Sequence, residues 1–279
     1  MGLLRLIFIR QPLFEQHKMK TKSPLKQSPL PNPGSSIDKK INELIDESAV
    51  GWIVVSGILF TITVLEWNRY LSPHPPSPLM YTFFFLLTTS FTVYRVITIR
   101  KTVKKLRQGR DGEIAVGQFL ERCRTQGAQV FHDVPGTGFN LDHVVIDKSG
   151  IYIIETKTIS KPEKGKAELV FDGKSISCNG LFATEAPIIQ VKAGRSWLCD
   201  LLTESSGRKL SKQLFRSVVV YPGWFVIPTA AAKSSDVWVL NPKALPSFIG
   251  NSAEQLSSED LNLYSFHLSK YIRSCSVKK

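Results

Sequence analysis

The chain has 279 residues, 43% of them hydrophobic, and a formal net charge of +13. This length suffices for one ordinary domain with extensions or for two small domains. The four cysteines form no C-x-x-C pair, which argues against a zinc site or a disulfide framework and fits a reducing compartment.

The positive charge is concentrated in one short stretch. Residues 95–110 hold seven basic side chains and no acidic one, whereas residues 49–94 hold only Glu66 and Arg69. Residues 111–279 carry 20 basic and 17 acidic side chains, an excess of only +3. Most of the basicity therefore needs an explanation that is local to residues 95–110.

The first 47 residues are expected to form a disordered, basic N-terminal segment, because residues 18–40 are rich in Lys, Pro and Ser. The apolar core of residues 1–10 is too short for a signal peptide, and Gly2 lacks the Ser or Thr at position 6 that is typical of a myristoylation site. Met19 is an alternative to Met1 as the true start.

Two apolar runs predict a transmembrane helical hairpin over residues 48–100. Ser48 to Leu65 are eighteen residues without a charge, and a second run begins at Leu79 and extends past Arg95 to Ile99. A bilayer core needs about 20 apolar residues of helix. We expect spans at about 48–67 and 79–99, joined by a Pro-rich loop. The alternative is a pair of buried helices in a soluble domain.

Basic residues flank the outer ends of both runs, while the connecting loop has one arginine. The positive-inside rule then places both termini and the following domain in the cytoplasm, for which a bacterial inner membrane is the expected setting, with the lipid bilayer as a partner. Residues 101–110 are expected to be a basic juxtamembrane linker. Its charge is a topology signal first, and a lipid or nucleic-acid contact only second.

Residues 111–279 are expected to form a soluble domain with a core at about 111–226. The second span continues as helix toward Gly109, and a separate helix is predicted from about Asp111, its cap, to Cys123. Glu113 would lie in the first turn of that helix. An acidic residue there is favoured by the helix dipole, which is the alternative to a functional role.

Two strand-like runs, residues 139–147 and 151–157, are separated by turn residues and predict a β-hairpin. A two-residue loop at Lys148-Ser149 pairs Asp147 with Gly150. The same register sets Asp142 opposite Glu155 and Asn140 opposite Lys157, with facing Cβ atoms about 4.5–5.5 Å apart. Glu155 and Lys157 share a face because strand side chains alternate.

Facing carboxylates repel each other unless a cation or a proton lies between them. A hard divalent ion such as Mg²⁺ or Mn²⁺ prefers oxygen ligands of this kind, and Lys157 would stand beside it as a point charge for water or phosphate. The hairpin therefore predicts metal-assisted phosphodiester hydrolysis by Asp142, Glu155 and Lys157. The alternative is a surface ladder in which Lys157 only neutralises its neighbours.

Several fragments together resemble the nuclease-related domain family, a branch of the PD-(D/E)xK restriction-endonuclease-like superfamily. They are GRDGEIAV at 109–116, NLDHVVIDKSGIYIIETK at 140–157 and APIIQVKAGRSWL at 186–198, in the order and spacing of the family. The resemblance covers about residues 111–220, and VVVYPGWFV and VWVLNP continue it. It implies an α/β fold, a restriction-endonuclease-like mixed sheet of four or five strands flanked by helices, which is here preceded by the transmembrane hairpin.

Carried over by position, the resemblance implies metal-binding carboxylates at Asp142 and Glu155 and a catalytic lysine at Lys157. It adds Glu113, as the helix glutamate that completes the metal or water network, and Gln190 near the site. Ala186-Pro187 replaces the Asn-Pro that is frequent before that glutamine, which puts a helix-capping interaction in question.

Two histidines near the site are not assigned to it. His143 directly follows Asp142, so its side chain is expected on the opposite sheet face, as a packing or surface residue. His132 has no specified role. Residues 168–178 predict a hairpin around Asp172-Gly173, and the chain beyond about Gln255 predicts a closing amphipathic helix.

The leading hypothesis is a membrane-anchored, Mg²⁺- or Mn²⁺-dependent nuclease that acts on DNA or RNA in the cytoplasm. The alternative is a non-catalytic, membrane-tethered nucleic-acid-binding or scaffold protein that retains the fold. The small charge excess of residues 111–279 favours the alternative, because it gives only a modest field for phosphates.

Overall fold

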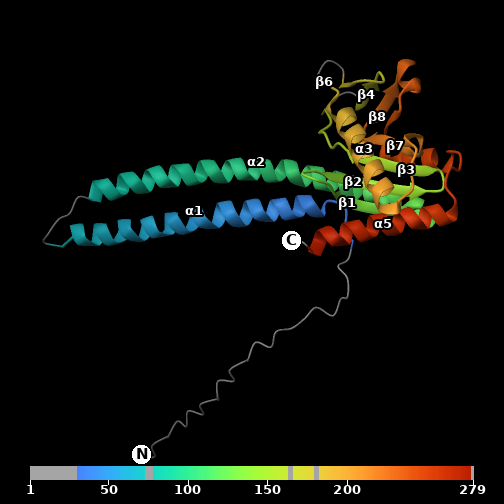
Figure 1. Ribbon diagram of the computed structural model, residues 1–279. Helices are drawn as coiled ribbons and strands as arrows, with labels where there is room; N and C mark the ends of the chain where they lie inside the picture. The colour runs from blue at the N-terminus through green and yellow to red at the C-terminus, as the bar shows by residue number, and fades with distance from the viewer. Residues whose placement is uncertain (1–29, 73–77, 163–165, 179–181, 278–279) are drawn as a thin grey trace, which may run out of the picture.

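The computed structural model describes residues 30–72, 78–162, 166–178 and 182–277. Two long helices form an arm that projects from a domain of two sheets and several helices (Figure 1). Met1 and Met19, together with most of the Pro-rich loop, lie outside the described residues.

The arm consists of α1 (Ser35–Tyr70) and α2 (Pro78–Thr125), which run side by side in opposite directions (Figure 1). Their facing surfaces meet through the rings of Trp52 and Phe91, whose centroids are 4.8 Å apart, and through a hydrogen bond of 3.1 Å between the Ser56 and Thr92 hydroxyls. Helix α1 begins at Ser35. The expectation of disorder as far as residue 47 was therefore wrong for residues 35–47.

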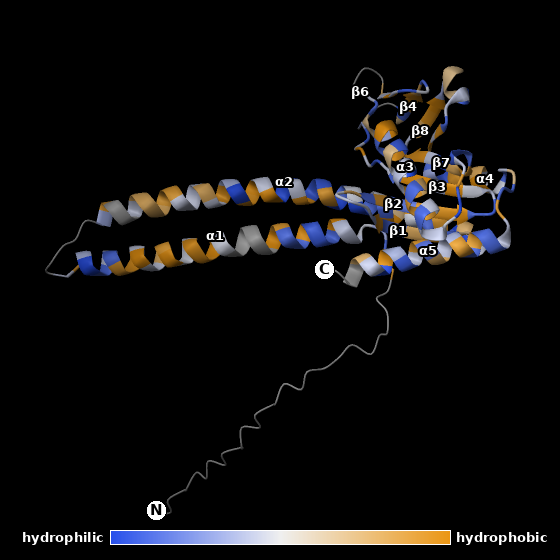
Figure 2. Ribbon diagram, in the orientation of Figure 1, coloured by the Kyte–Doolittle hydropathy of each residue, from blue (hydrophilic) through white to orange (hydrophobic). Residues whose placement is uncertain are grey.

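Both helices of the arm expose their apolar side chains, as the orange bands of Figure 2 show. By length and composition, α1 over Gly51–Tyr70 and α2 from Thr82 onward are each able to cross a membrane. Only 6% and 0% of the residues in their most apolar windows are buried. The alternative of two buried helices in a soluble domain therefore fails, because these helices do not lie in the core.

Helix α2 continues without interruption from the arm into the domain. Two expectations were wrong here: residues 101–110 are helix interior and form no linker, and Asp111 caps no new helix. Close packing supports the helix at this point, since Gly112 lies directly against Thr158 and Gly109 faces Ile37. Glu113 therefore lies in the interior of α2, so the dipole of its own helix does not explain its position.

The larger sheet has five strands in the order β1-β2-β3-β7-β9. Strand β2 pairs with β1 and with β3 in antiparallel orientation, whereas β7 pairs with β3 and with β9 in parallel orientation, so the sheet is mixed, as expected. The bounds are β1 (Gln129–Pro135), β2 (Asn140–Asp147), β3 (Gly150–Thr156), β7 (Phe215–Val220) and β9 (Val237–Leu240).

A second sheet of four strands, in the order β6-β5-β4-β8, stands beside the first. It contains the predicted hairpin, in which β4 pairs with β5 across a turn where Gly173 has a φ of +97°. The sheet as a whole was not predicted. Its strands are β4 (Glu168–Phe171), β5 (Ile176–Cys178), β6 (Phe182–Thr184) and β8 (Phe225–Pro228).

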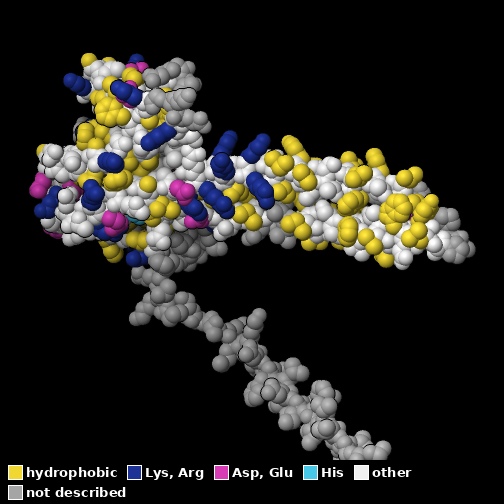
Figure 3. All heavy atoms as spheres, turned by 180° about the vertical axis from the view of Figure 1, so that it is seen from behind, with side chains coloured by type: hydrophobic (Ala, Val, Ile, Leu, Met, Phe, Trp, Pro, Cys, Tyr) yellow, Lys and Arg dark blue, Asp and Glu magenta, His cyan; other side chains and the backbone are white. Residues whose placement is uncertain are grey.

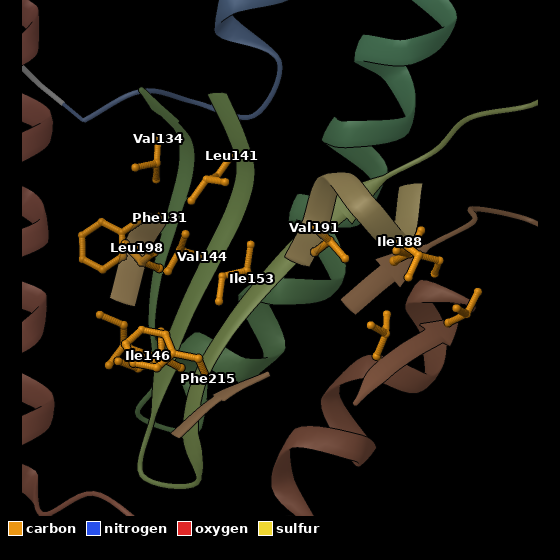
Figure 4. Close-up of a cluster of buried hydrophobic side chains, with 14 of the residues drawn as sticks. Phe131, Val134, Leu141, Val144, Ile146, Ile153, Ile188, Val191, Leu198 and Phe215 are labelled. Carbon is orange, nitrogen blue, oxygen red and sulfur yellow. The ribbon is translucent and has the colours of Figure 1, made fainter. Parts of the chain in front are cut away.

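Helices cover both faces of the five-stranded sheet. On one face α3 (Ala186–Ser206) and α5 (Ser258–Val277) cover a cluster that Figure 4 shows around Val144, Ile153 and Leu198. On the other face α2 and the short α4 (Leu245–Gly250) enclose a second cluster. Helix α5 is the expected closing helix. Short 3-10 helices lie between other elements, at Lys212–Leu214, Ala231–Ser234 and Pro242–Ala244.

We predict opposite effects for two glycines of α2. A Cβ at Gly112 would overlap the Thr158 hydroxyl and lie 3.0 Å from its Cβ, whereas a Cβ at Gly109 would come no closer than 3.8 Å to Ile37. Gly112→Ala should therefore destabilise the domain by about 1–3 kcal/mol through overpacking. Gly109→Ala should stabilise it by about 0.5–1 kcal/mol through helix propensity.

The measurement is guanidinium unfolding of the full chain in detergent, followed by tryptophan fluorescence, to which the buried Trp224 contributes. Equal midpoints for the two variants would contradict the close approach of α2 to Thr158.

Candidate active site

The β2–β3 hairpin has the predicted register. Asp147 pairs with Gly150, and the pairing continues in step as far as His143 and Ile154. The next position in this register is Asp142 with Glu155. The paired register ends at His143 and Ile154, and Lys157 lies one residue beyond β3, so the expected pairs of Asp142 with Glu155 and of Asn140 with Lys157 fall outside it. The Asn140 amide donates to Asp133 at 2.8 Å, and the Lys157 backbone N–H donates to Val220 in β7.

Asp142 turns its carboxylate toward β3. Its Oδ2 accepts a hydrogen bond of 2.7 Å from the backbone N–H of Thr156, so the side chain lies across the end of the hairpin next to Glu155. Asp142 is half-buried, and Glu155 is buried at 5% exposure. Two carboxyl groups therefore lie close together at one edge of the sheet, where β2 begins and β3 ends, partly shielded from solvent.

Lys157 joins β3 to α3. Its Nζ lies 2.7 Å from Glu155 Oε1 and 2.9 Å from Gln190 Oε1. Gln190 stands in the first turns of α3, so this helix brings its amide to the lysine. The structure thus brings together Glu155, Lys157 and Gln190, which sequence and resemblance had selected separately.

The start of α3 bears on the capping question. Its N-cap residue, Glu185, makes no side-chain capping bond, and Pro187 lies at the helix start. The hydroxyl of Thr184 accepts from the Ala186 N–H at 3.2 Å instead. Gln190 is therefore held at the site without the capping interaction that Ala186-Pro187 had put in question.

Glu113 reaches the same edge from α2. Its side chain is buried at 8% exposure and accepts a hydrogen bond from the backbone N–H of Gly34. Burial raises the pKa of Glu113 to about 7, the charges of Asp133 and Glu155 add to this effect, and Lys157 opposes it. Glu113 thus lies within the electrostatic field of the other site residues.

The carboxyl groups of the site disfavour one another's ionised form. Burial raises the pKa of Asp142 well above its usual value, and the charges of Glu155 and Glu113 raise it further. Burial also raises the pKa of Glu155, although Lys157 and Gln190 act against it. Three acids with one ammonium among them have an excess of negative charge that a proton or a cation relieves.

Asp133 is a residue that sequence reasoning missed. It is buried, has a φ of +51°, and its carboxylate accepts from the Ser35 hydroxyl and the Ser36 N–H, both at 2.5 Å. It therefore caps α1 from outside that helix, where a negative charge is favoured. The only sequence signal was Ser35 with an acid three positions later, a pattern typical of a helix start.

The residues just before α1 consequently belong to the domain. Gly34 bonds to Glu113, Pro33 packs against Gly117, and Asp38 forms an ion pair of 2.8 Å with Arg110. A fragment that begins after the arm would lack these contacts. The complete chain is therefore the relevant form for any assay of the site.

His132 and His143 form a buried pair with 2.8 Å between their Nδ1 atoms. They face each other across β1 and β2. Burial lowers the pKa of His132 to about 4 and that of His143 well below its usual value. Strand alternation sets His143 on the sheet face opposite to Asp142, so its assignment to packing holds.

The donor chemistry fits Mg²⁺ or Mn²⁺. Carboxylate oxygens are the ligands these ions prefer, and the excess negative charge of Glu113, Asp142 and Glu155 calls for a cation. In the part of the chain that the structure describes, however, no three His, Cys, Asp or Glu residues are gathered closely enough to hold a metal ion. The acids fit the ion in kind and charge, with the Glu155 carboxylate engaged by Lys157.

Comparisons with known proteins identify the domain that carries this site. Residues 108–222 match the family model described as the nuclease-related domain. The chain therefore contains a nuclease-related domain, as the sequence motifs indicated, and the restriction-endonuclease-like superfamily is consistent with it. The matched range includes all five site residues: Glu113, Asp142, Glu155, Lys157 and Gln190.

A solved structure gives a weaker likeness. It is SfsA of Pyrococcus furiosus in complex with Ca²⁺, with 15% sequence identity and a TM-score of 0.24. The alignment covers 47% of this chain and 54% of SfsA, so the chain spans about half of that protein. Comparison with the curated proteins finds no match.

The raised pKa of Glu113 predicts a pH-dependent stability. Its value of about 7 lies above the ordinary 4.5, so the folded state holds this proton more tightly than the unfolded state. Stability should therefore fall as the pH rises from about 4.5 to about 7. Glu113→Gln removes this loss. Without divalent ions the variant should be more stable than the parent by about 2–3 kcal/mol above pH 7, and equal to it near pH 4.

Denaturant unfolding at several pH values measures this difference. Glu121→Gln, an exposed acid on the same helix, is the matched control and should follow the parent throughout. A gain for Glu113→Gln that does not change with pH would refute the raised pKa.

Proposed function

We propose that the protein is a membrane-anchored nuclease that hydrolyses phosphodiester bonds of DNA or RNA with the aid of Mg²⁺ or Mn²⁺. The nuclease-related domain supports the chemical class. The observation that carries the proposal is the position of Lys157 Nζ, 2.7 Å from Glu155 and 2.9 Å from Gln190 at an edge shared with Asp142.

Lys157 is suited to bind the phosphate that is attacked. An ammonium group has three N–H donors, and Glu155 and Gln190 occupy two of them. One donor is left for a phosphate oxygen, and the side chain is 32% exposed, so a substrate can reach it. The amide of Gln190 holds the ammonium in place while this third donor binds the substrate.

The carboxyl groups divide the remaining roles. Asp142 and Glu155, with Glu113 beside them, would hold the divalent ion, which supplies Lewis-acid stabilisation and an activated water. Glu113, with its pKa of about 7, is suited to accept the proton of the attacking water. The water oxygen bonds to phosphorus as the ester P–O bond breaks, and Lys157 stabilises the negative charge that develops.

The anchor is proposed from the arm. Two helices of sufficient length and apolarity project from the domain, with exposed Ile53, Phe60, Phe83 and Leu87 among their side chains. Exposed apolar surface of this extent is unfavourable in water. The basic residues at 95–110 support, through the positive-inside rule, a domain and two termini on the cytoplasmic side of a bacterial inner membrane.

A non-catalytic nucleic-acid-binding or scaffold protein is the second candidate. It is favoured by the lack of a gathered metal-ligand group among the described residues and by the small charge excess of the domain. Titration calorimetry of Mg²⁺ into the full chain separates the two candidates. Heat that depends on the site carboxylates supports the nuclease, and its absence supports the scaffold.

We predict that Glu155→Gln lowers cleavage on the order of 10³-fold, because it removes one metal-binding carboxylate while it keeps the shape of the side chain. The assay uses the full chain in detergent with single- and double-stranded DNA and RNA, with and without Mn²⁺. Glu185→Gln, an exposed acid at the start of α3, is the control and should retain activity. Unchanged cleavage by Glu155→Gln would refute the catalytic assignment.

We also predict the topology. Ser72 follows α1 at the far end of the arm, and Cys275 lies near the end of α5. In intact spheroplasts, a membrane-impermeant maleimide should label Ser72→Cys and should leave Cys275 unmodified until the membrane is permeabilised. The other three cysteines are buried and give little background. Labelling of Cys275 in intact spheroplasts would refute the cytoplasmic placement of the domain.

A further inference from the structure

A cavity of about 1060 Å³ lies where the arm meets the domain. Its lining changes character along its length. On the arm side it is formed by Ile53, Val96 and Ile99, and nearer the domain by Arg100, Lys104 and Arg107. The cavity is therefore apolar on the arm side, and nearer the domain the three cations line it together with Val103, Ala115 and Pro222.

The three cations share one face of α2, because residues three and four apart are neighbours on a helix. All three are exposed, and none forms an ion pair within the described part of the chain. Asp111 also lines the cavity, but Arg110 already pairs with it at 2.9 Å. Arg100, Lys104 and Arg107 thus face a shared space, and no ion pair among the described side chains engages them.

The cations lie at the depth where lipid headgroups would be found. Figure 3 shows dark blue side chains between the yellow arm and the domain. Arg100 is about 6 Å of helix beyond Val96, and Arg107 about 16 Å. Side chains on a helix lean toward its N-terminus, which for α2 is the membrane end, so Lys104 and Arg107 reach back toward the bilayer.

We propose that this cavity binds one anionic phospholipid of the cytoplasmic leaflet. The phosphate would be held by Arg100, Lys104 and Arg107, and the first part of an acyl chain would lie on Ile53, Val96 and Ile99. The proposal rests on the membrane insertion of the arm. It goes beyond that insertion, because insertion alone requires no particular headgroup and no single site.

The apolar end of the cavity favours a lipid over a nucleic acid. A nucleic-acid backbone offers phosphates at regular spacing but nothing to cover Ile53, Val96 and Ile99, whereas a phospholipid has both a charged head and an apolar tail. The apolar end is also continuous with the exposed apolar surface of the arm, from which a lipid would enter.

The domain end of the cavity is formed in part by Gly112 and Thr158. These residues directly adjoin Glu113 and Lys157 in sequence, and they pack against each other. A bound headgroup would therefore lie close to the segment that carries the candidate catalytic lysine.

The test uses the full chain in nanodiscs of phosphatidylcholine with or without phosphatidylglycerol, with retained lipid counted by native mass spectrometry. The variant replaces Arg100, Lys104 and Arg107 by Gln. The matched control replaces Arg95, Lys101 and Lys105 by Gln. It removes the same charge from the same stretch, at residues that do not line the cavity. Each cation near a membrane surface contributes about fivefold to the affinity for an anionic lipid. The cavity variant should therefore bind phosphatidylglycerol on the order of a hundredfold more weakly.

Retention of one phosphatidylglycerol by the parent and the control, with loss in the cavity variant, supports the proposal. Equal loss in both triple variants would overturn it in favour of a diffuse basic surface, and no preference for phosphatidylglycerol in the parent would overturn it outright. Displacement of the retained lipid by a short oligonucleotide would reassign the cavity to the substrate.

Two further readouts separate this proposal from the proposed function. Flotation with vesicles tests the anchor, and a chain that fails to float removes both the anchor and the lipid site. Cleavage by the parent and its loss in Glu155→Gln test the nuclease independently of any bound lipid.

Discussion

The continuity of α2 is the constraint on which the rest of the structure depends. One helix runs from Pro78 in the arm to Thr125 in the domain, and it carries Glu113 at the edge of the sheet where Asp142 and Glu155 lie. The chain passes through Gly109 and Gly112 without a break, although glycine weakens a helix interior. The near contact of Gly112 with Thr158 gives the helix a packing reason to continue. Arm and site are therefore parts of one element.

The other arm helix, α1, is held at the site by hydrogen bonds to two buried acids. The Asp133 carboxylate accepts from the first residues of α1, and Gly34, just before that helix, donates to Glu113. Both acids are buried, which costs free energy unless hydrogen bonds or opposite charges compensate it. The start of α1 supplies such bonds, so the arm contributes to the stability of the site and not only to its location.

The hairpin and its chemistry were predictable because they depend on local rules. A two-residue loop set the register, and strand alternation placed Glu155 and Lys157 on one face. The contact of Lys157 with Gln190 followed only from the resemblance, since no local rule links β3 to a helix more than thirty residues later. Glu113 was selected in the same way, and the helix turn expected around it was wrong.

What escaped prediction depends on partners distant in sequence. The start of α1 is capped by Asp133, which lies 98 residues after Ser35, so its own segment looked disordered. The second sheet contains a parallel pairing of β4 with β8, and the sequence between these two strands gives no signal that predicts it. In both cases the stabilising contact is tertiary, and composition within a short window does not contain it.

The unbroken helix also fixes the distance between the site and the apolar part of the arm. Each residue of α2 adds about 1.5 Å of rise and about 100° of rotation, so Glu113 stands about 21 Å from Ile99 in a set direction. A flexible linker would let the domain move over a wide range of distances from the bilayer, whereas this continuous helix restricts the site to a narrow range of distances. In a chain inserted as proposed, the site meets only those strands that come close to the membrane surface. Proximity to the bilayer then acts as a spatial filter on substrates, independent of their sequence.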